Sequence, residues 1–271
     1  MRSGTTSLFN YILDNSQVQM PFCKETHFFD KGYAKGLEFY ENLFKKYENK
    51  DIITGEATPS YMYMQEVPER IKTHIPNAKL IFILREPVSR ANSHYWHNIR
   101  FGIETYSFKK ALQKEEERLA KKDLKSRMRY SYKDRGKYIV QLKRYQKYFP
   151  EKQMLVLLYD DLKQNPDKVM EKIFNFLELK PRYPVFKYKK QFHVGKTPLS
   201  HSIQRMRGKI PYQSKNPYYK QIDPLRFIID LINLKPGYPP INQKTQKELK
   251  AYFKPYNEEL ESYLKIKLEN W

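Results

Sequence analysis

The chain has 271 residues, of which 40% are hydrophobic and 15% aromatic, a balance that predicts a folded globular protein rather than a disordered one. Its 51 lysine and arginine residues exceed its 30 aspartate and glutamate residues, so the formal net charge is +21. Such a charge attracts polyanions over long distances, although a lysine-rich solvated surface explains it equally well. No nucleic-acid-binding motif accompanies the charge, so we expect no nucleic-acid partner.

Cysteine and histidine usage bears on location and cofactors. The single cysteine, Cys23, cannot form an internal disulfide, and six scattered histidines show no zinc-binding spacing. We therefore expect a reducing compartment, the cytoplasm, and no metal. The sequence contains no run of 18 apolar residues and no charged leader before an apolar run. A soluble chain without a membrane span is therefore predicted.

Helical and strand patterns alternate along the first two thirds of the chain. Apolar spacing predicts helices over 5–15, 36–47, 67–74, 88–99, within 107–125, over 137–149 and over 165–179. Short apolar runs predict strands at 18–21, 51–56, 78–86 and 153–161. Continuous apolar strands separated by helices are typical of a parallel sheet covered on both faces. The expected fold class is α/β, with a central parallel β-sheet flanked by helices.

The last third of the chain has a different amino-acid composition. Residues 181–240 are rich in Pro, Tyr, Lys and Asn and show little periodicity, apart from a predicted helix near 223–234. This stretch is either a linker or a cover over the active site. A final amphipathic helix is predicted over 243–264. We expect one domain that spans residues 1–271.

The opening stretch "RSGTTS" leads directly into the first predicted helix. A loop of this kind supplies free backbone N–H groups, the positive end of a helix dipole, hydroxyls and a cation, which together suit a terminal phosphate. The Walker pattern of P-loop nucleotidases is absent. On its own, the stretch is equally compatible with an ordinary helix capped by Ser or Thr.

A second polar segment, "LREPVSRANSHYWH" (84–97), follows the most apolar predicted strand. It places Arg85 at the carboxyl end of that strand and Ser93 early on the next helix. Ligands of open parallel sheets bind outside the carboxyl ends of the strands, so both segments should face one crevice. Two anion sites in one crevice suit a ligand with two separated phosphates.

These two segments together resemble the sulfotransferases that use 3'-phosphoadenosine 5'-phosphosulfate (PAPS), of the bacterial and heparan-sulfate type. In that family a Lys/Arg-Ser/Gly-Gly-Thr-Thr loop cradles the 5'-phosphosulfate, and an Arg-x-Pro-x-x-Arg-x-x-Ser-x-Tyr segment binds the 3'-phosphate. The first is similar to Arg2 to Thr6, and the second to Arg85, Pro87, Arg90, Ser93 and Tyr95. The resemblance implies the P-loop-NTPase-like sulfotransferase fold and PAPS as co-substrate.

Further segments extend the resemblance to about Leu264. "KETHFFDKGYAKGLEFY" (24–40) is similar to the family segment whose glutamate, here Glu25, serves as catalytic base. The segments 55–62, 135–150 and 252–260 also resemble family segments, and 192–202 lies where the family has a basic loop over the nucleotide. The candidate nucleotide-binding residues are Arg2, Ser3, Gly4, Thr5, Thr6, Ser7, Arg85, Ser93 and Lys196; the candidate catalytic residues are Glu25, Arg2 and His27; the candidate acceptor contacts are Tyr61, Arg135 and Tyr138.

Alternatives accompany several of these assignments. His27 would share a face with Glu25 in an extended segment, and it is a second base, a hydrogen-bond partner or a packed histidine. For Lys196 and Arg135 the alternative is an exposed basic residue without a role. The heparan-sulfate enzymes usually carry a lysine before Thr-Pro where this chain has Ala57, so a second catalytic cation is missing or comes from elsewhere.

The early position of the loop conflicts with the family pattern, because family members have a buried strand just before it. Here only Met1 precedes Arg2. An unpaired slot in a parallel sheet would leave backbone groups and apolar surface unsatisfied. We therefore expect that the true start lies upstream.

The resemblance implies sulfuryl transfer from PAPS to an acceptor hydroxyl or amine, on a carbohydrate by family analogy. Two rival functions stay open. A polyanion-binding protein with a decayed nucleotide site would explain Ala57 and the net charge of +21. A P-loop kinase that uses ATP is the other, and the absent Walker pattern argues against it.

Overall fold

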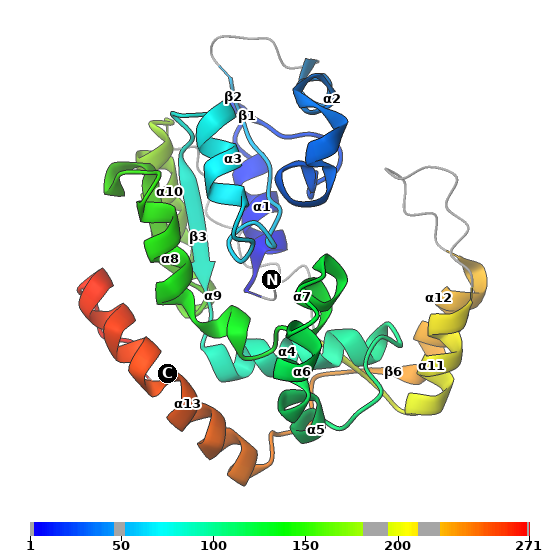
Figure 1. The fold of residues 1–271 in the computed structure, drawn as a ribbon. Coiled ribbons are helices and arrows are strands. Elements are labelled where there is room, and N and C mark those ends of the chain that lie inside the picture. The colour runs from blue at the N-terminus through cyan, green and yellow to red at the C-terminus, as the bar shows by residue number, and fades with distance from the viewer. Residues whose placement is uncertain (1–2, 46–51, 181–194, 211–222, 270) are drawn as a thin grey trace. The chain divides into compact units, whose positions relative to one another are not determined.

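The computed structural model describes residues 3–45, 52–180, 195–210, 223–269 and 271. The chain, drawn as a ribbon in Figure 1, divides into two units. Unit 1 comprises Met1–Arg85 and Tyr138–His193, and unit 2 comprises Glu86–Lys137 and Val194–Trp271. The expectation of one domain over the whole chain stays a prediction.

Unit 1 contains the parallel strands that the apolar runs predict. Strand β1 (Val18–Gln19) pairs in parallel with β2 (Ile53–Thr54), and the two lie side by side in Figure 1. Strand β3 (Leu80–Leu84) pairs in parallel with β4 (Met154–Leu158) over five residues. In the described residues these pairs are two separate sheets, so the expected central sheet is present as two halves.

The helices of unit 1 form its buried core together with β3 and β4. These helices are α1 (Thr5–Leu13), α2 (Leu37–Asn42), α3 (Val67–His74), α8 (Tyr138–Gln146), α9 (Tyr159–Gln164) and α10 (Pro166–Leu177). Short turns of other helix types are η1 (Phe28–Gly32), η2 (Tyr33–Lys35) and η5 (Glu151–Gln153). Helix α1 packs Leu8 and Ile12 into the cluster that contains Ile83 of β3 and Ile173 of α10. The 3.6-residue spacing of the apolar side chains explains why one face of each helix is buried.

A cavity of about 680 Å³ separates the two strand pairs of unit 1. Val18 and Ile53 line it from one pair, and Ile81 and Ile83 line it from β3. Phe9 of α1 closes it further. Among the described strands β3 pairs only with β4, and residues of β3 line this cavity.

Unit 2 is mainly helical. Its elements are α4 (Pro87–Arg100), α5 (Phe108–Gln113), α6 (Glu115–Leu119), α7 (Leu124–Tyr130), η4 (Asp134–Gly136), β5 (Lys196–Pro198), α11 (His201–Lys209), α12 (Pro224–Asn233), β6 (Leu234–Pro236) and α13 (Gln243–Leu264). The Glu86 carboxylate caps α4 by accepting hydrogen bonds from the first-turn amides of Val88 and Ser89. Helices α4 and α13 share a core in which Tyr95 and Phe253 are buried. Strands β5 and β6 are antiparallel.

Most predicted elements are present, with differences at their ends. The strand predicted at 153–161 ends at Leu158, because Tyr159 begins α9. The charged helix predicted within 107–125 is divided into α5 and α6 by Lys114. Helices α7 and α11 and the β5–β6 pair were not predicted, since their segments carry little apolar periodicity. Among the described residues, every helix is too short or too polar to cross a bilayer.

Candidate active site

Helix α1 begins at a glycine that the local geometry requires. Gly4 is the N-cap residue, with a φ of 81°, a left-handed conformation that side-chain-bearing residues avoid. A Cβ atom at this position would lie 2.8 Å from the ring of Tyr159 at the start of α9. The loop therefore passes close over an aromatic side chain and presents the first-turn amides of α1. Ser3 is buried, whereas Arg2 lies outside the described residues.

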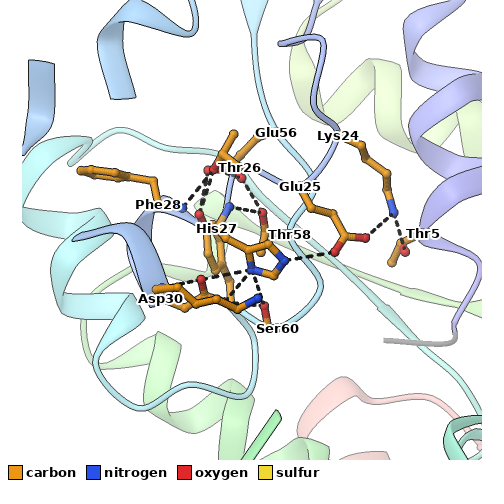
Figure 2. Close-up of polar contacts among 12 residues, drawn as sticks. Thr5, Lys24, Glu25, Thr26, His27, Phe28, Asp30, Glu56, Thr58 and Ser60 are labelled. Atoms are coloured by element: carbon orange, nitrogen blue, oxygen red, sulfur yellow. Dashed lines mark hydrogen bonds and ion pairs between the residues drawn. The ribbon is translucent and has the colours of Figure 1, made fainter. Parts of the chain in front are cut away.

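Lys24 joins this loop to the candidate base (Figure 2). Its Nζ atom donates to the Oγ1 atoms of Thr5 and Thr6, at 3.2 Å each, and lies 3.4 Å from Oε1 of Glu25. No role for Lys24 was predicted from the sequence. Its position next to Glu25 in the sequence could have suggested a role in the site, but its contact with the threonines depends on the fold. An ammonium group thus lies between the hydroxyls of the loop and the carboxylate.

His27 lies between two carboxylates (Figure 2). Its Nε2 atom is 3.4 Å from Oε2 of Glu25, and its Nδ1 atom is 3.0 Å from Oδ2 of Asp30. Ser60 donates to the same Oδ2 atom at 2.6 Å, and the Asp30 side chain is fully buried. His27 has a φ of 53° and precedes the π-helical turn η1, so an unusual backbone conformation turns its ring toward both carboxylates. Of the three readings left open for His27, its contacts match a hydrogen-bond partner.

The electrostatics of this cluster favour its ionised form. Burial opposes the charge on His27, but the hydrogen bonds to Asp30 and Glu25 outweigh it and raise the pKa of His27 to about 9. Burial also opposes ionisation of Glu25, yet the hydrogen bond with His27 and the charge of Lys24 lower its pKa to about 2. The pKa of Asp30 is likewise lowered, against burial, by His27 and Ser60. Near neutral pH the cluster is therefore carboxylate, imidazolium and carboxylate.

Tyr61, a candidate acceptor contact, belongs to a second polar network beside this cluster. Its hydroxyl donates to Glu56 at 3.1 Å and accepts from the backbone amide of Phe29 at 3.0 Å. Glu56 also accepts hydrogen bonds of 2.6 Å from Thr26 and Thr58. Burial raises the pKa of Glu56 in spite of these bonds. The network fixes the chain around Thr26, and this use of the Tyr61 hydroxyl is structural.

Arg85 reaches the same part of unit 1 as the loop. Its guanidinium lies 5.1 Å from the centre of the Tyr159 ring, the ring that also packs under Gly4. Tyr138, another candidate, is buried, and its hydroxyl donates to the backbone oxygen of Arg85 at 2.7 Å. The two candidate anion-binding segments thus share Tyr159 as a neighbour. Tyr159 was not singled out in the sequence, because it was read as part of a strand.

The remaining candidates belong to unit 2. Ser93 is buried on α4, with its hydroxyl 3.2 Å from that of Tyr238. Lys196 is exposed on β5, which packs against α4. Arg135 was expected to contact ligand or solvent, but its side chain is only 3% exposed and donates to Ser131 and to the backbone oxygen of Arg127. Its observed contacts hold the α7–η4 turn together.

The described residues contain no cluster of His, Cys, Asp and Glu side chains that could hold a metal ion. The polar groups that could hold a nucleotide are of another kind: amides at the start of α1, threonine hydroxyls, an ammonium group and a guanidinium. All of these groups suit phosphate or sulfate oxygens.

Comparison with known proteins identifies the family. The family model described as the sulfotransferase domain matches residues 1–220. Heparan sulfate glucosamine 3-O-sulfotransferase 5 of Mus musculus is 29% identical over 250 residues, covering 90% of this chain and 68% of that protein. Membrane-associated sulfotransferase kil1 of Dictyostelium discoideum is 40% identical over 104 residues, or 37% of this chain and 22% of that protein. Heparan sulfate glucosamine 3-O-sulfotransferase 3B1 of Homo sapiens is 26% identical over 261 residues, covering 94% of this chain and 59% of that protein.

Solved structures agree on the fold. A sulfotransferase from Alicyclobacillus acidocaldarius superimposes with a TM-score of 0.71 at 24% identity, covering 100% of this chain and 94% of that one. A mouse sulfotransferase complexed with PAP gives a TM-score of 0.53 at 16% identity, covering 97% of this chain and 84% of that one. The chain spans from 22% to 68% of the length of the three curated relatives. With the domain match over most of its length, the chain belongs to the sulfotransferase family and has its α/β fold.

Proposed function

We propose that this protein transfers a sulfuryl group from PAPS to an acceptor hydroxyl or amine of a carbohydrate, with Glu25 as general base. The observation that carries the proposal is the contact chain in unit 1 from the α1 threonines through Lys24 to Glu25 and His27. In this contact chain two threonine hydroxyls, an ammonium group, a carboxylate and an imidazole lie next to one another, which supports the proposal. Family membership supports the reaction type, and the heparan sulfate relatives support the carbohydrate acceptor.

The donor side of the reaction uses the start of α1. The first-turn amides, the Thr5 and Thr6 hydroxyls and Lys24 would bind the phosphosulfate, and Arg2 would add a second cation. Ala57 stands where the heparan-sulfate enzymes usually have a lysine, and Lys24 lies next to it. The backbone amide of Ala57 donates to the backbone oxygen of Lys24 at 3.0 Å. Lys24, on the segment that pairs with Ala57, would supply the cation that the family usually takes from a lysine at the position of Ala57.

The transfer itself is an in-line displacement at sulfur. The acceptor oxygen or nitrogen forms a bond to sulfur while the bond from sulfur to the phosphate oxygen breaks, and PAP leaves with the negative charge. Lys24 and the α1 amides stabilise that charge. The acceptor proton passes to a carboxylate oxygen of Glu25, a role commonly worth roughly 10²- to 10⁴-fold in rate.

His27 positions the base in this scheme. With one nitrogen toward Asp30 and the other toward Glu25, the imidazolium holds the carboxylate in place and keeps it ionised. A carboxylate of low pKa is a weak base toward a free hydroxyl. In a loose transition state, however, the acceptor becomes acidic only as its bond to sulfur forms, so that a well-placed weak base is sufficient.

Titration calorimetry with PAP, using AMP and ATP as controls, tests the nucleotide site without knowledge of the acceptor. Tight binding that requires the 3'-phosphate is expected, and Arg85→Ala should abolish it. A preference for ATP would instead favour a kinase. Salt-sensitive binding of heparin without any sulfate transfer would favour a polyanion-binding protein.

A pair of glutamate variants tests the base. Glu25→Gln should bind PAP like the wild type and lose at least roughly 10²-fold in turnover with a panel of saccharide acceptors and PAPS. Glu41→Gln, at an exposed glutamate of α2, is the matched control and should keep full turnover. Normal turnover by Glu25→Gln would disprove the assignment of the base.

The cytoplasmic location of the protein stays a prediction.

A further inference from the structure

Helix α12 of unit 2 packs with its polar face inward. The Asn233 amide donates to the backbone oxygen of Ser200 at 2.9 Å and to the side-chain oxygen of Gln204 at 2.8 Å. Asp230 pairs with Arg207, whose Nε atom lies 2.7 Å away, and accepts from Gln204 at 3.1 Å. Asn233, Gln204 and Arg207 are buried. These bonds fix which side of α12 meets α11.

The opposite side of α12 is apolar and faces solvent. Five side chains form it, each between 52% and 69% exposed: Leu225, Phe227, Ile228, Leu231 and Ile232. At about 100° per residue they occupy one continuous arc of roughly 160° around the helix. We call these five residues the α12 patch. A contiguous exposed apolar surface of this kind marks an interaction site, because scattered single residues are the rule elsewhere on protein surfaces.

Helix α11 and strand β6, which both contact α12, carry exposed cations. Arg205 and Lys209 are exposed on α11, and Lys235 is exposed on β6, which follows α12 directly. The acidic residues of α12 and its cap are already engaged: Asp230 pairs with Arg207, and Asp223 caps the first turn of α12. The elements in contact with α12 therefore present exposed positive charge.

We propose that the α12 patch binds the surface of a membrane that contains anionic lipids, with α12 lying in the plane of the interface. Such a surface supplies both the apolar layer and the negative headgroups that the patch and its rim require. A second copy of the chain fits less well, because a symmetric contact would bring the same cations together without acidic partners. Helix α12 has ten residues and so can lie on a bilayer but not cross it.

Vesicle sedimentation tests the proposal with the whole chain. Binding to vesicles of phosphatidylcholine mixed with phosphatidylserine is expected, with little binding to phosphatidylcholine alone and a loss of binding at high salt. The double variant Ile228→Ser, Leu231→Ser should weaken binding by on the order of tenfold or more. Val140→Ser replaces a side chain that is 46% exposed on α8 and serves as the matched control, which should bind like the wild type.

A spectroscopic variant reports insertion directly. In Phe227→Trp, the added indole fluorescence should be quenched by brominated acyl chains in mixed vesicles, relative to the wild-type chain with its own tryptophans. PAP binding should be the same in every variant, which separates this surface from the nucleotide site. No vesicle binding, or binding that the double variant retains, would overturn the proposal. A dimer that the double variant dissociates, without vesicle binding, would assign the patch to a second copy instead.

Discussion

Replacing Asp30 by asparagine tests the electrostatic core of the candidate active site. The change keeps the size of the side chain and a hydrogen-bond acceptor for Ser60, but it removes the buried negative charge beside His27. Glu25 remains as the other partner of the ring, 3.4 Å away. We expect the pKa of His27 to fall from about 9 to about 7 in this variant, because an opposite charge within hydrogen-bond distance commonly raises a pKa by about one to three.

The same shift sets a stability difference with a defined pH dependence. Raising the pKa of His27 from 6.5 to about 9 is worth at most about 3–4 kcal/mol, since a tenfold change in proton affinity corresponds to about 1.4 kcal/mol. A raised pKa stabilises the folded chain fully below pH 6.5, and this contribution is lost as the pH rises through about 9. Asp30→Asn should therefore lower the free energy of unfolding by about 3 kcal/mol below pH 6.5 and by much less above pH 9, because the pKa of His27 falls by about two, at about 1.4 kcal/mol for each tenfold change in proton affinity.

Two measurements check this reasoning. An NMR titration of the histidine ring protons gives the pKa of His27 in the wild type and in Asp30→Asn, with His27→Gln used to assign the signal. Urea denaturation at pH values below 6.5 and above 9 gives the stability difference. A wild-type His27 that titrates at the ordinary value, or a stability difference that does not change with pH, would refute the charged carboxylate–imidazolium–carboxylate arrangement.

Substitutions at three further positions test single contacts. Lys24→Met should lower kcat by roughly 10- to 10³-fold while Lys24→Arg retains part of it, because a cation meets the leaving phosphate; equal rates in Lys24→Met and wild type would exclude that role. Gly4→Ala places a Cβ atom 2.8 Å from Tyr159 at a positive φ, so a lower melting temperature and weaker PAP binding are expected. Scanning calorimetry measures the melting temperature and titration calorimetry the PAP affinity; if neither changes, the loop tolerates a side chain at this position. Gly136→Ala puts a Cβ atom 2.6 Å from the Phe253 ring and should cost about 1–3 kcal/mol in urea unfolding without altering PAP affinity.

Local patterns in the sequence were enough for most elements of the fold. Helices α3 and α13 have the predicted bounds, Val67–His74 and Gln243–Leu264, because apolar periodicity and the flanking residues act within a few turns of the chain. The strands β3 and β4 lie within predicted apolar runs for the same reason. The division of the strands into two separate pairs was not predicted, since pairing depends on segments that are distant in the sequence.

The candidate site likewise has residues that the sequence predicts and contacts that depend on the fold. The motif residues Glu25 and His27 could be named from the sequence, because residue types at fixed spacing carry that resemblance. The role of Lys24 depended on the approach of its side chain to α1, and the shared contact of Gly4 and Arg85 with Tyr159 required the packing of α9. Spacing along the chain does not report such contacts.

Residue patterns alone are thus sufficient to predict the α/β class, the positions of most helices and strands and the family to which the loop and the Arg85 segment point. The neighbours of each face of those elements depend instead on how the chain folds. Arg135 is buried in a structural turn, and α12 turns its apolar side to solvent, although the residues alone would suggest the reverse in both cases. The physical reason is that periodicity defines the faces of a helix, whereas burial is decided by the hydrogen bonds and side chains of its neighbours.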